Sequence, residues 1–329
     1  MTRAEAWEKF QEDHQKRQEE LRQVFWDNLQ ERLGGLMECI YAAFEEIGKQ
    51  AEEQKKEDCM YFLYSLQRCD LLRGKAVVRL DVSNMEWYLD ETPLSASFDI
   101  TFLFQEHFAW QEELLLDMRE YMGKVNKYDV DALVQDEIML CSQLITHILR
   151  FAFRSLEQQE VFSSIKKLPF WVIRWGEYKD YSEIVIQVKR DTRGQEVWED
   201  RLKQYEENPE ILTADYWYRE NLTKGDCQGK NLFFIVFEEC QLKGIDFSRA
   251  DLSGARFIRC RIEECSFADA NLHQADFEDC QFFENEFKNA GLEQATFSEE
   301  GFQPELFDEK QLAELLIVED MGKAEEESQ

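Results

Sequence analysis

Residues 250–279 of the chain read ADLSGARFIRCRIEECSFADANLHQADFED, and a large apolar residue stands at every fifth position of this stretch. The same spacing holds over fourteen consecutive positions. These positions are Leu232, Phe237, Leu242, Phe247, Leu252, Phe257, Ile262, Phe267, Leu272, Phe277, Phe282, Phe287, Leu292 and Phe297. The residue two places before each of them is nearly always small or apolar, and the remaining positions are mostly polar or charged. Two patterns kept in step over about seventy residues indicate an internal repeat.

A period of five is typical of neither an amphipathic helix, with 3.6 residues per turn, nor a flat strand, whose side chains alternate. It indicates a chain that turns a corner every five residues and closes a square coil every twenty. Coils stacked at the strand spacing of about 4.8 Å would bring residues twenty apart into contact. The apolar positions favour this prediction, because they separate into columns of like residues. The two most uniform columns are Leu232, Leu252, Leu272, Leu292 and Phe237, Phe257, Phe277, Phe297.

The repeat resembles the pentapeptide-repeat proteins, whose motif is roughly A-(D/N)-L-x-x. Residues 250–252 (Ala-Asp-Leu) and 270–272 (Ala-Asn-Leu) match this motif letter for letter. The resemblance implies a right-handed quadrilateral β-helix over residues 220–302, with about three and a half regular coils. The register continues less regularly upstream, so we expect an irregular first coil from about Glu220.

The length and composition bound the class of protein. With 329 residues, the chain has room for two or three domains. It contains no run of eighteen apolar residues, and its N-terminus leads into charged sequence rather than an apolar signal segment. Nine cysteines, an odd number largely at apolar positions, indicate a reducing compartment. We therefore expect a cytoplasmic protein.

The chain is strongly acidic, with 69 acidic and 38 basic residues and a formal net charge of −31. Nucleic-acid binders normally carry a basic patch, and an anionic membrane repels such a chain. The acidity then has two interpretations. Either self-repulsion keeps the protein soluble, or an acidic rod imitates DNA and occupies a DNA-binding enzyme.

Residues 1–215 read as one mixed helical and α+β domain that resembles no family. Helical spacing predicts three helices within residues 1–72, the second after Gly34-Gly35 and the third over 59–72. These helices form either a partner-binding arm or a plain helical core. Farther along we expect strands over 76–84 and 95–104, helices over 106–122 and 130–156, a hairpin of 170–175 with 182–189, and a helix over 195–207.

Residues 303–318 are expected to form a helix that closes the repeat after Gln303-Pro304. The end of a β-helix exposes apolar rings and unpaired backbone groups, so it needs a cap. The helix is either this cap or a homodimerisation element, since the resemblance includes quinolone-resistance proteins that pair through their C-terminal ends. Residues 319–329 are acidic, small and polar, and we expect them to be disordered.

The sequence predicts no catalytic, cofactor-binding or metal site, because it holds no Gly-rich phosphate loop, no His-Glu-x-x-His and no Gly-x-Ser-x-Gly. Cys240, Cys260 and Cys280 should stack in one column. A ladder of thiols does not converge on a point as tetrahedral zinc requires, so we expect buried corner fillers. His147 lies near the apolar face of its predicted helix and should be packed, whereas His273 should point outward from its coil.

A rigid solenoid offers flat faces to partners, so we expect a non-enzymatic protein-interaction or scaffold protein. Its candidate partner surface consists of acid pairs that recur at outward positions of the repeat. These are Glu238, Glu239, Glu263, Glu264, Glu278 and Asp279. The expected partner is a protein, without direct nucleic-acid or membrane binding and without a cofactor.

Two other functions stay open. The resemblance implies a DNA-mimicking protector of gyrase or topoisomerase, of the quinolone- or toxin-resistance kind. Arg256 and Arg259 among the acids disfavour it, and so does the length, because three and a half coils span only about 17 Å. The second alternative is an enzyme in the N-terminal domain that uses the repeat as a docking platform.

Overall fold

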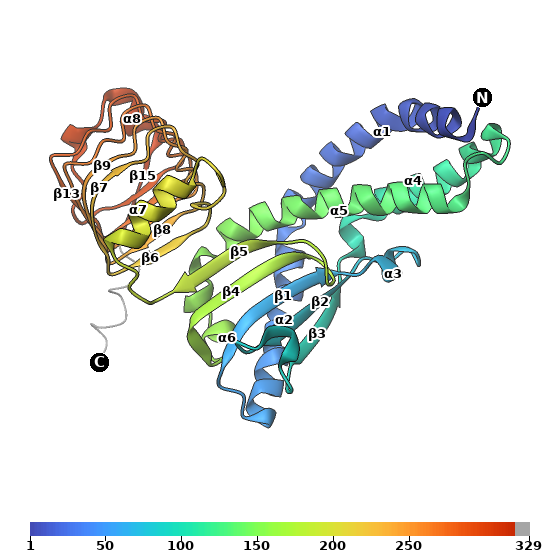
Figure 1. The fold of residues 1–329 in the computed structure, drawn as a ribbon, viewed down its shortest axis with the longest axis horizontal. Coiled ribbons are helices and arrows are strands. Elements are labelled where there is room, and N and C mark those ends of the chain that lie inside the picture. Colours follow the sequence, from blue (N-terminus) through green and yellow to red (C-terminus); the bar gives the residue numbers. More distant parts are fainter. Residues whose placement is uncertain (320–329) are drawn as a thin grey trace. The chain divides into compact units, whose positions relative to one another are not determined.

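The computed structural model describes residues 1–319 and divides the chain into two units, residues 1–186 and the residues from Gln187 onward (Figure 1). We find no candidate membrane span among the described helices, each of which is too short or too polar to cross a bilayer. The first unit combines helices with a mixed sheet, and the second is a solenoid of parallel strands.

The first unit is built on a five-stranded sheet in the order β3-β2-β1-β4-β5. Its strands are β1 (Cys59–Leu66), β2 (Val77–Ser83), β3 (Leu94–Asp99), β4 (Lys167–Glu177) and β5 (Ser182–Lys189). The central strand β1 is antiparallel to β2 and parallel to β4. Phe44 of α2 (Leu33–Gln54) packs against Phe62 and Tyr64 of β1, with ring centroids 6.2 and 6.1 Å apart. Helix α2 therefore covers this face of the sheet.

Three long helices of this unit, α1, α4 and α5, contact one another (Figure 1). The side chains of Thr2 and Asn126 form capping boxes at the starts of α1 and α5, which supply partners for otherwise unpaired amides. The helices and helical turns are α1 (Arg3–Glu31), α3 (Arg68–Leu71), η1 (Trp87–Leu89), η2 (Thr101–Leu103), α4 (Gln105–Asp117), η3 (Met118–Tyr121), α5 (Lys127–Ala152), η4 (Phe153–Gln158) and α6 (Glu160–Ser163).

The expected third helix over 59–72 is wrong, because Cys59–Leu66 forms the central strand β1. Six of the eight residues of β1 are buried, and such a short apolar run has no period that separates strand from helix. Only Arg68–Leu71 forms a helical turn. The break between the first two helices lies at Arg32, and Gly34-Gly35 lies inside α2.

The other expected strands are found with altered ends. The strand expected over 76–84 is confirmed as β2, whereas β3 ends at Asp99 and the rest of 95–104 includes a 3-10 turn. The hairpin of β4 and β5 is confirmed, with the Glu177 amide donating to the Tyr181 carbonyl at 2.9 Å. A Cβ at Gly176 would lie 2.2 Å from that carbonyl oxygen, so this close approach requires glycine.

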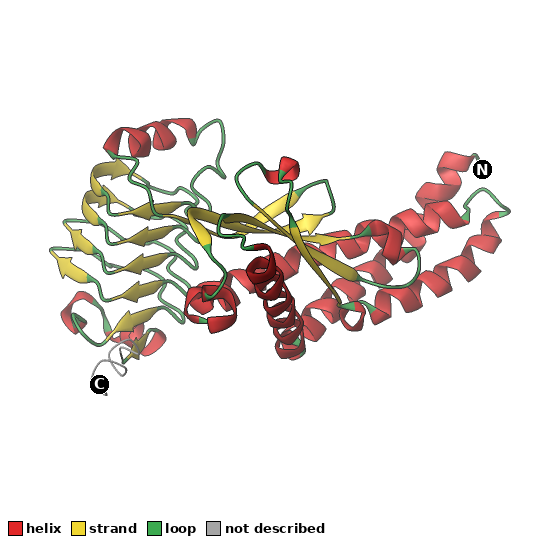
Figure 2. Ribbon diagram, turned by 90° about the horizontal axis from the view of Figure 1, so that it is seen from below, coloured by secondary structure: helices red, strands yellow, loops and turns green. Residues whose placement is uncertain are grey.

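The second unit stacks square coils in register, which confirms the solenoid (Figure 2). One side is the six-stranded parallel sheet β15-β14-β12-β10-β8-β6, and the adjacent side is the four-stranded parallel sheet β13-β11-β9-β7. Single bridges such as Asp246↔Ser266 and Asp251↔Asn271 join the coils on the other two sides. The strands are β6 (Tyr216–Tyr218), β7 (Asn221–Asp226), β8 (Val236–Glu238), β9 (Gln241–Asp246), β10 (Arg256–Ile258), β11 (Arg261–Glu263), β12 (Asp276–Glu278), β13 (Gln281–Phe283), β14 (Thr296–Ser298) and β15 (Leu316–Val318).

The solenoid has about five coils, because the six strands of its larger sheet follow one another at intervals of twenty residues. The expected number of three and a half coils was too low, because the solenoid extends beyond the regular repeat at both ends. Trp217 takes the inward position of the first coil, and β15 adds a last strand beside β14. The irregular first coil expected near Glu220 thus begins slightly earlier, at β6.

The inward aromatic side chains form the predicted columns. Phe237, Phe257, Phe277 and Phe297 stack with successive ring centroids 5.4, 4.7 and 4.6 Å apart and interplanar angles of 18°, 3° and 11°. In a second stack, the ring centroids of Phe267 and Phe287 lie 4.8 Å apart. All of these rings are at most 1% exposed, so they make up the core of the solenoid.

The corner residues fall into two chemical classes. Buried alanines such as Ala255 and Ala275 fill the corners just before the strands of the six-stranded sheet, where the preceding side of the coil is a turn. At the corners that flank the four-stranded sheet, cysteine or asparagine donates a hydrogen bond to a carbonyl of the preceding coil. The donors are Cys240, Cys260, Cys265, Cys280 and Asn285, and the acceptors are the carbonyls of Trp217, Phe237, Leu242, Phe257 and Ile262. The expected burial of the cysteine column is confirmed.

A short helix packs at each end of the solenoid. At the first coil, α7 (Gln195–Gln204) places Trp198 against Trp217, with ring centroids 5.1 Å apart. At the last coil, Gln311 of α8 (Glu309–Glu314) donates to the carbonyls of Phe287 and Ala290 at 2.7 and 3.0 Å.

The expected helix over 303–318 is only partly found. It is replaced by η5 (Pro304–Leu306), α8 and β15, since the last residues extend to pair with β14. Of the tail 319–329, for which we expect disorder, residues 320–329 lie outside the described residues.

We predict that Phe257→Ala lowers the free energy of unfolding of the solenoid by about 3–5 kcal/mol, because it removes a fully buried ring from the stack. Phe283→Ala is the matched control, since Phe283 is 39% exposed at an outward position of the same unit. Urea unfolding followed by circular dichroism measures both. Equal losses in the two variants would contradict the assignment of inward and outward positions.

Candidate functional site

The outer side of the four-stranded sheet, formed by outward residues of β7, β9, β11 and β13, is here called the four-stranded face. On it, Lys243 Nζ lies 2.5 Å from Glu263 Oε1 and 3.1 Å from Glu264 Oε1. The guanidinium of Arg261 lies 3.3 Å from Glu263 and 3.9 Å from the ring centroid of Phe283. Phe283 is 39% exposed, so this face combines fixed charges of both signs with an accessible aromatic ring.

Of the other four predicted surface acids, Glu238 and Glu278 end β8 and β12, and Glu239 and Asp279 directly follow them. Glu238 is only 6% exposed. Arg259 approaches Glu238 at 2.6 Å, Arg219 approaches Glu239 at 2.6 Å, and Arg256 approaches Glu278 at 3.3 Å. Asp279 follows Glu278 and has a positive φ of 50°. Five of the six predicted acids therefore take part in ion pairs, nearly all of which connect neighbouring coils.

These ion pairs shift the acid equilibria. The hydrogen bond from Arg219 lowers the pKa of Glu239, and the hydrogen bond from Lys243 lowers that of Glu263. Burial instead raises the pKa of Glu278, which Arg256 only partly offsets. Residues 215–300 carry 18 acidic and nine basic residues, nearly the same ratio as the whole chain. The acidity of the protein is thus not concentrated on the solenoid.

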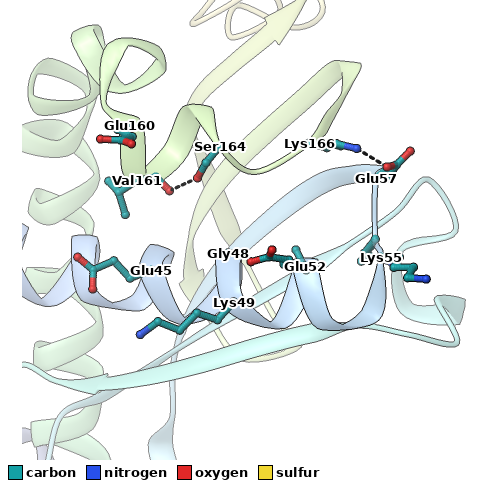
Figure 3. A pocket seen from close by; sticks show the side chains of 12 residues that line it. Glu45, Gly48, Lys49, Glu52, Lys55, Glu57, Glu160, Val161, Ser164 and Lys166 are labelled. Carbon is teal, nitrogen blue, oxygen red and sulfur yellow. Dashed lines mark hydrogen bonds and ion pairs between the residues drawn. The ribbon is translucent and has the colours of Figure 1, made fainter.

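An open groove of about 870 Å³ lies in the first unit between α2 and the segment that contains α6 (Figure 3). Lysines and glutamates alternate along it, and Lys166 pairs with Glu57 across its end. Lys56 is turned into the protein, where its Nζ lies 2.8 Å from Asp90 Oδ2. The groove therefore presents charges of both signs without a concentration of either.

The Lys56–Asp90 pair is buried, with side chains 2% and 0% exposed. Burial alone would raise the pKa of Asp90, but hydrogen bonds from Lys56 and from the Thr92 and Asn84 amides outweigh it and lower the pKa. Burial would likewise lower the pKa of Lys56, but the bond to Asp90 outweighs it and raises the pKa. The pair fixes the loop after β2 to the end of α2.

A buried polar cluster lies between the long helices of the first unit. His107 of α4 and Glu137 and Cys141 of α5 place one nitrogen, oxygen and sulfur atom within 4.8 Å of one another. Arg22 of α1 donates to both carboxylate oxygens of Glu137, at 2.6 and 2.8 Å. Among the described residues this is the one group of three side chains arranged to hold a metal ion.

The cluster changes the protonation of its members. Burial lowers the pKa of His107 to about 4 and raises that of Cys141 to about 12, so both are neutral near pH 7. For Glu137, burial raises the pKa, but hydrogen bonds from Arg22 and Gln18 outweigh it and lower the pKa. The Nδ1 atom of His107 is buried without a hydrogen-bond partner.

The two histidines considered from the sequence have no ligand arrangement. His147 is half-buried, with its ring centroid 5.5 Å from that of Phe151. His273 points outward as predicted, and its Nδ1 lies 3.8 Å from a carboxylate oxygen of Glu293. The cluster around His107 carried no recognisable sequence motif, because its members come from separate segments.

The comparisons with known proteins concern the solenoid. The family model of the pentapeptide repeat region matches residues 231–302. No curated protein matches the chain.

Among solved structures, HetL is a pentapeptide repeat protein involved in heterocyst differentiation regulation, from the cyanobacterium Nostoc sp.. It is 21% identical over 28% of this chain and 41% of its own, with a TM-score of 0.26. A thylakoid-lumen protein of Arabidopsis thaliana is 20% identical over 28% of this chain and 58% of its own, with a TM-score of 0.14. The fluoroquinolone-resistance protein QnrB1 is 20% identical over 26% of this chain and 64% of its own, with a TM-score of 0.12. The chain thus spans about half the length of the first two structures.

We predict that Asp90→Asn lowers the free energy of unfolding by about 3–5 kcal/mol at neutral pH, because it leaves Lys56 buried without its counterion. The folded-state pKa of Asp90 is lowered, so its contribution is complete above about pH 4 and is lost as the pH falls through that lowered value. The pKa of Lys56 is raised, so its contribution is complete below about pH 10 and is lost as the pH rises through the raised value.

Thermal or urea unfolding across the pH range measures this difference between the wild-type chain and Asp90→Asn. Asp58→Asn serves as the control, since Asp58 lies 3.4 Å from the same ammonium group but is 49% exposed. A difference that grows toward acid pH would contradict the assignment.

Proposed function

Because residues 231–302 form a pentapeptide repeat region, we propose that the chain is a non-enzymatic scaffold protein that binds a protein partner through its solenoid. The observation that carries the proposal is the four-stranded face. There, exposed Phe283 lies under Arg261 within a fixed lattice of charges. We place this function in the cytoplasm, in keeping with nine unpaired cysteines.

The rigidity of the four-stranded face favours binding. Its strands are parallel and in register, with Arg261 opposite Gln281 and Gln241, and Glu263 opposite Phe283 and Lys243. Side chains held in this way lose little conformational entropy when a partner docks, so more of the contact energy appears as affinity. Aromatic and arginine side chains are also the residues that most often dominate binding energy at protein interfaces.

The mixed charges of this face favour a protein over nucleic acid as the partner. Lys243 and Arg261 alternate with Glu263 and Glu264, so a partner needs complementary charges of both signs. The same mixture disfavours imitation of DNA, whose phosphates form an uninterrupted negative array. Binding to gyrase or topoisomerase therefore remains the alternative, and an enzyme in the N-terminal unit the second alternative.

We predict that Phe283→Ala combined with Arg261→Glu weakens partner capture by at least about tenfold, since anchor residues of this kind each contribute about 2 kcal/mol or more. The full chain serves as bait in native lysate, and retained proteins are quantified by mass spectrometry. Lys288→Glu is the matched control, because it makes the same charge change on a side of the coil without a continuous sheet.

The partner set distinguishes the alternatives. Equal retention by all three baits would contradict the four-stranded face as the partner surface. Retention of gyrase or topoisomerase by every bait would instead favour the DNA-mimic alternative. A partner held by residues 1–186 would favour a role for the N-terminal unit.

We also propose that the C-terminal end of the solenoid pairs with a second copy of the chain. Strand β15 ends its sheet, and Leu316, Ile317 and Val318 are 52%, 52% and 42% exposed. Ile317 stands opposite Phe297 in the register, so an apolar residue at an inward position of the coil is half-exposed at this end. Among the described residues, no further strand pairs with β15. A strand edge of this kind with apolar residues is a template for pairing with another strand.

We predict that Ile317→Lys converts a dimer to a monomer, because a charged side chain cannot be buried between the two ends. Light scattering coupled to size-exclusion chromatography measures the mass. Leu89→Lys is the control, because Leu89 is 79% exposed in the N-terminal unit. A wild-type chain that is monomeric, or a variant that stays dimeric, would overturn this proposal.

A further inference from the structure

We propose that His107, Glu137 and Cys141 form a binding site for one divalent transition-metal ion, of which zinc is the best match. The three side chains supply an imidazole nitrogen, a carboxylate oxygen and a sulfur. These are the ligand types that zinc takes in proteins. The site belongs to the first unit, whereas the proposed function is assigned to the solenoid of the second unit.

The spacing of the ligand atoms fits a shared ion. His107 Nε2 lies 3.5 Å from Cys141 Sγ, and Cys141 Sγ lies 3.7 Å from Glu137 Oε1. Zinc–sulfur bonds of about 2.3 Å and zinc–nitrogen bonds of about 2.0 Å at tetrahedral angles separate neighbouring ligand atoms by roughly these distances. Glu137 and Cys141 are four residues apart on α5, so both project from one side of that helix toward His107 of α4.

The hydrogen bonds around Glu137 leave one oxygen site that only the Cys141 thiol contacts. A carboxylate has about four lone-pair sites. Arg22 Nε donates to Oε1, while Arg22 and Gln18 both donate to Oε2. The remaining site on Oε1 accepts only the weak hydrogen bond from the Cys141 thiol, at 3.7 Å. A metal ion would take this site when the thiol loses its proton.

Arg22 and Gln18 then act as positioning residues. They hold the carboxylate in place from α1, as outer hydrogen-bond partners commonly do for metal ligands. Glu137 and a deprotonated Cys141 carry two negative charges, and His107 is a neutral ligand. With the guanidinium of Arg22 counted, a divalent ion leaves the cluster with one net positive charge. The thiol proton leaves to solvent when the metal–sulfur bond forms.

The three side chains are buried and make only weak contacts with one another, which favours binding of an ion. His107, Glu137 and Cys141 are only 1–2% exposed, and the Cys141 sulfur lies 3.5 Å from His107 Nε2 and 3.7 Å from Glu137 Oε1. A thiol is a weak hydrogen-bond donor and acceptor, so it satisfies neither neighbour well. A bound ion would replace these weak contacts with coordinate bonds and join α4 to α5.

The test uses the full chain, reduced and freed of metal with a chelator, and Co²⁺ as a spectroscopic probe for zinc. We expect one Co²⁺ per chain, with visible ligand-field bands and a sulfur-to-cobalt charge-transfer band. Cys141→Ser should abolish the charge-transfer band, and His107→Gln should weaken binding at least about tenfold. Arg22→Gln should weaken it by about 10-fold to 100-fold, as expected for an outer partner of a ligand.

Cys69→Ser is the matched control, because Cys69 is an exposed thiol of the same unit and its loss should leave the spectrum unchanged. Circular dichroism establishes that each variant is folded, and His107→Gln takes the place of Cys141→Ser if the latter unfolds. Zinc should also raise the melting temperature of the wild-type chain in proportion to the logarithm of its concentration, but not that of a folded ligand variant. A folded wild-type chain without the charge-transfer band, or a band that persists in Cys141→Ser, would overturn the proposal.

Discussion

Backbone hydrogen bonds between neighbouring coils fix the position of every side chain in the solenoid. The backbone amide of Leu252 donates to the carbonyl of Asn271 at 2.8 Å, and that of Arg256 donates to the carbonyl of Ile235 at 2.9 Å. Since each coil meets the next in the same register, a residue type that recurs every twenty positions becomes a row in space. The phenylalanine stacks inside and the ion-pair rows outside are both consequences of this register. The ion pairs contribute little to stability individually, because most are partly exposed. They decide instead how the outer faces present charge.

The regular part of the solenoid could be predicted from the sequence because the five-residue period assigns each position locally as inward or outward. The ends could not, since the corner pattern fails there before the apolar pattern does. Trp217 is preceded two places earlier by Asp215 rather than by a small residue. At the other end, Phe302, Phe307 and Ile317 keep the five-residue register, yet Glu300 and Glu305 stand at the corners. Outward acids were predicted from the sequence, yet Glu238 is only 6% exposed. Its burial and the pairing of the acids with arginine depend on which coils are neighbours.

The first unit was harder to predict for a different reason. In β1, neighbours on both edges and helices on one face bury consecutive residues, so the strand lacks the alternation that identifies a half-buried strand. The cluster of His107, Glu137 and Cys141 was missed because α4 and α5 bring together residues thirty or more positions apart. A helix-to-helix contact of this kind leaves no motif in the sequence. Only Glu137 and Cys141, four residues apart, carry a local signal, and that spacing is common in helices without any site.

The two corner classes have a consequence for how such a chain can change length during evolution. Each coil contacts only the coils directly before and after it, and its corner donors reach back one coil and no further. A duplication of twenty residues between Phe237 and Phe277 would therefore bring its own donors, its own acceptors and its own aromatic rings. Neither terminal cap would have to adapt, while the outer face would grow by about 4.8 Å. The length of the outer face can thus change by insertion of whole coils, without a change in the side chains of the existing coils.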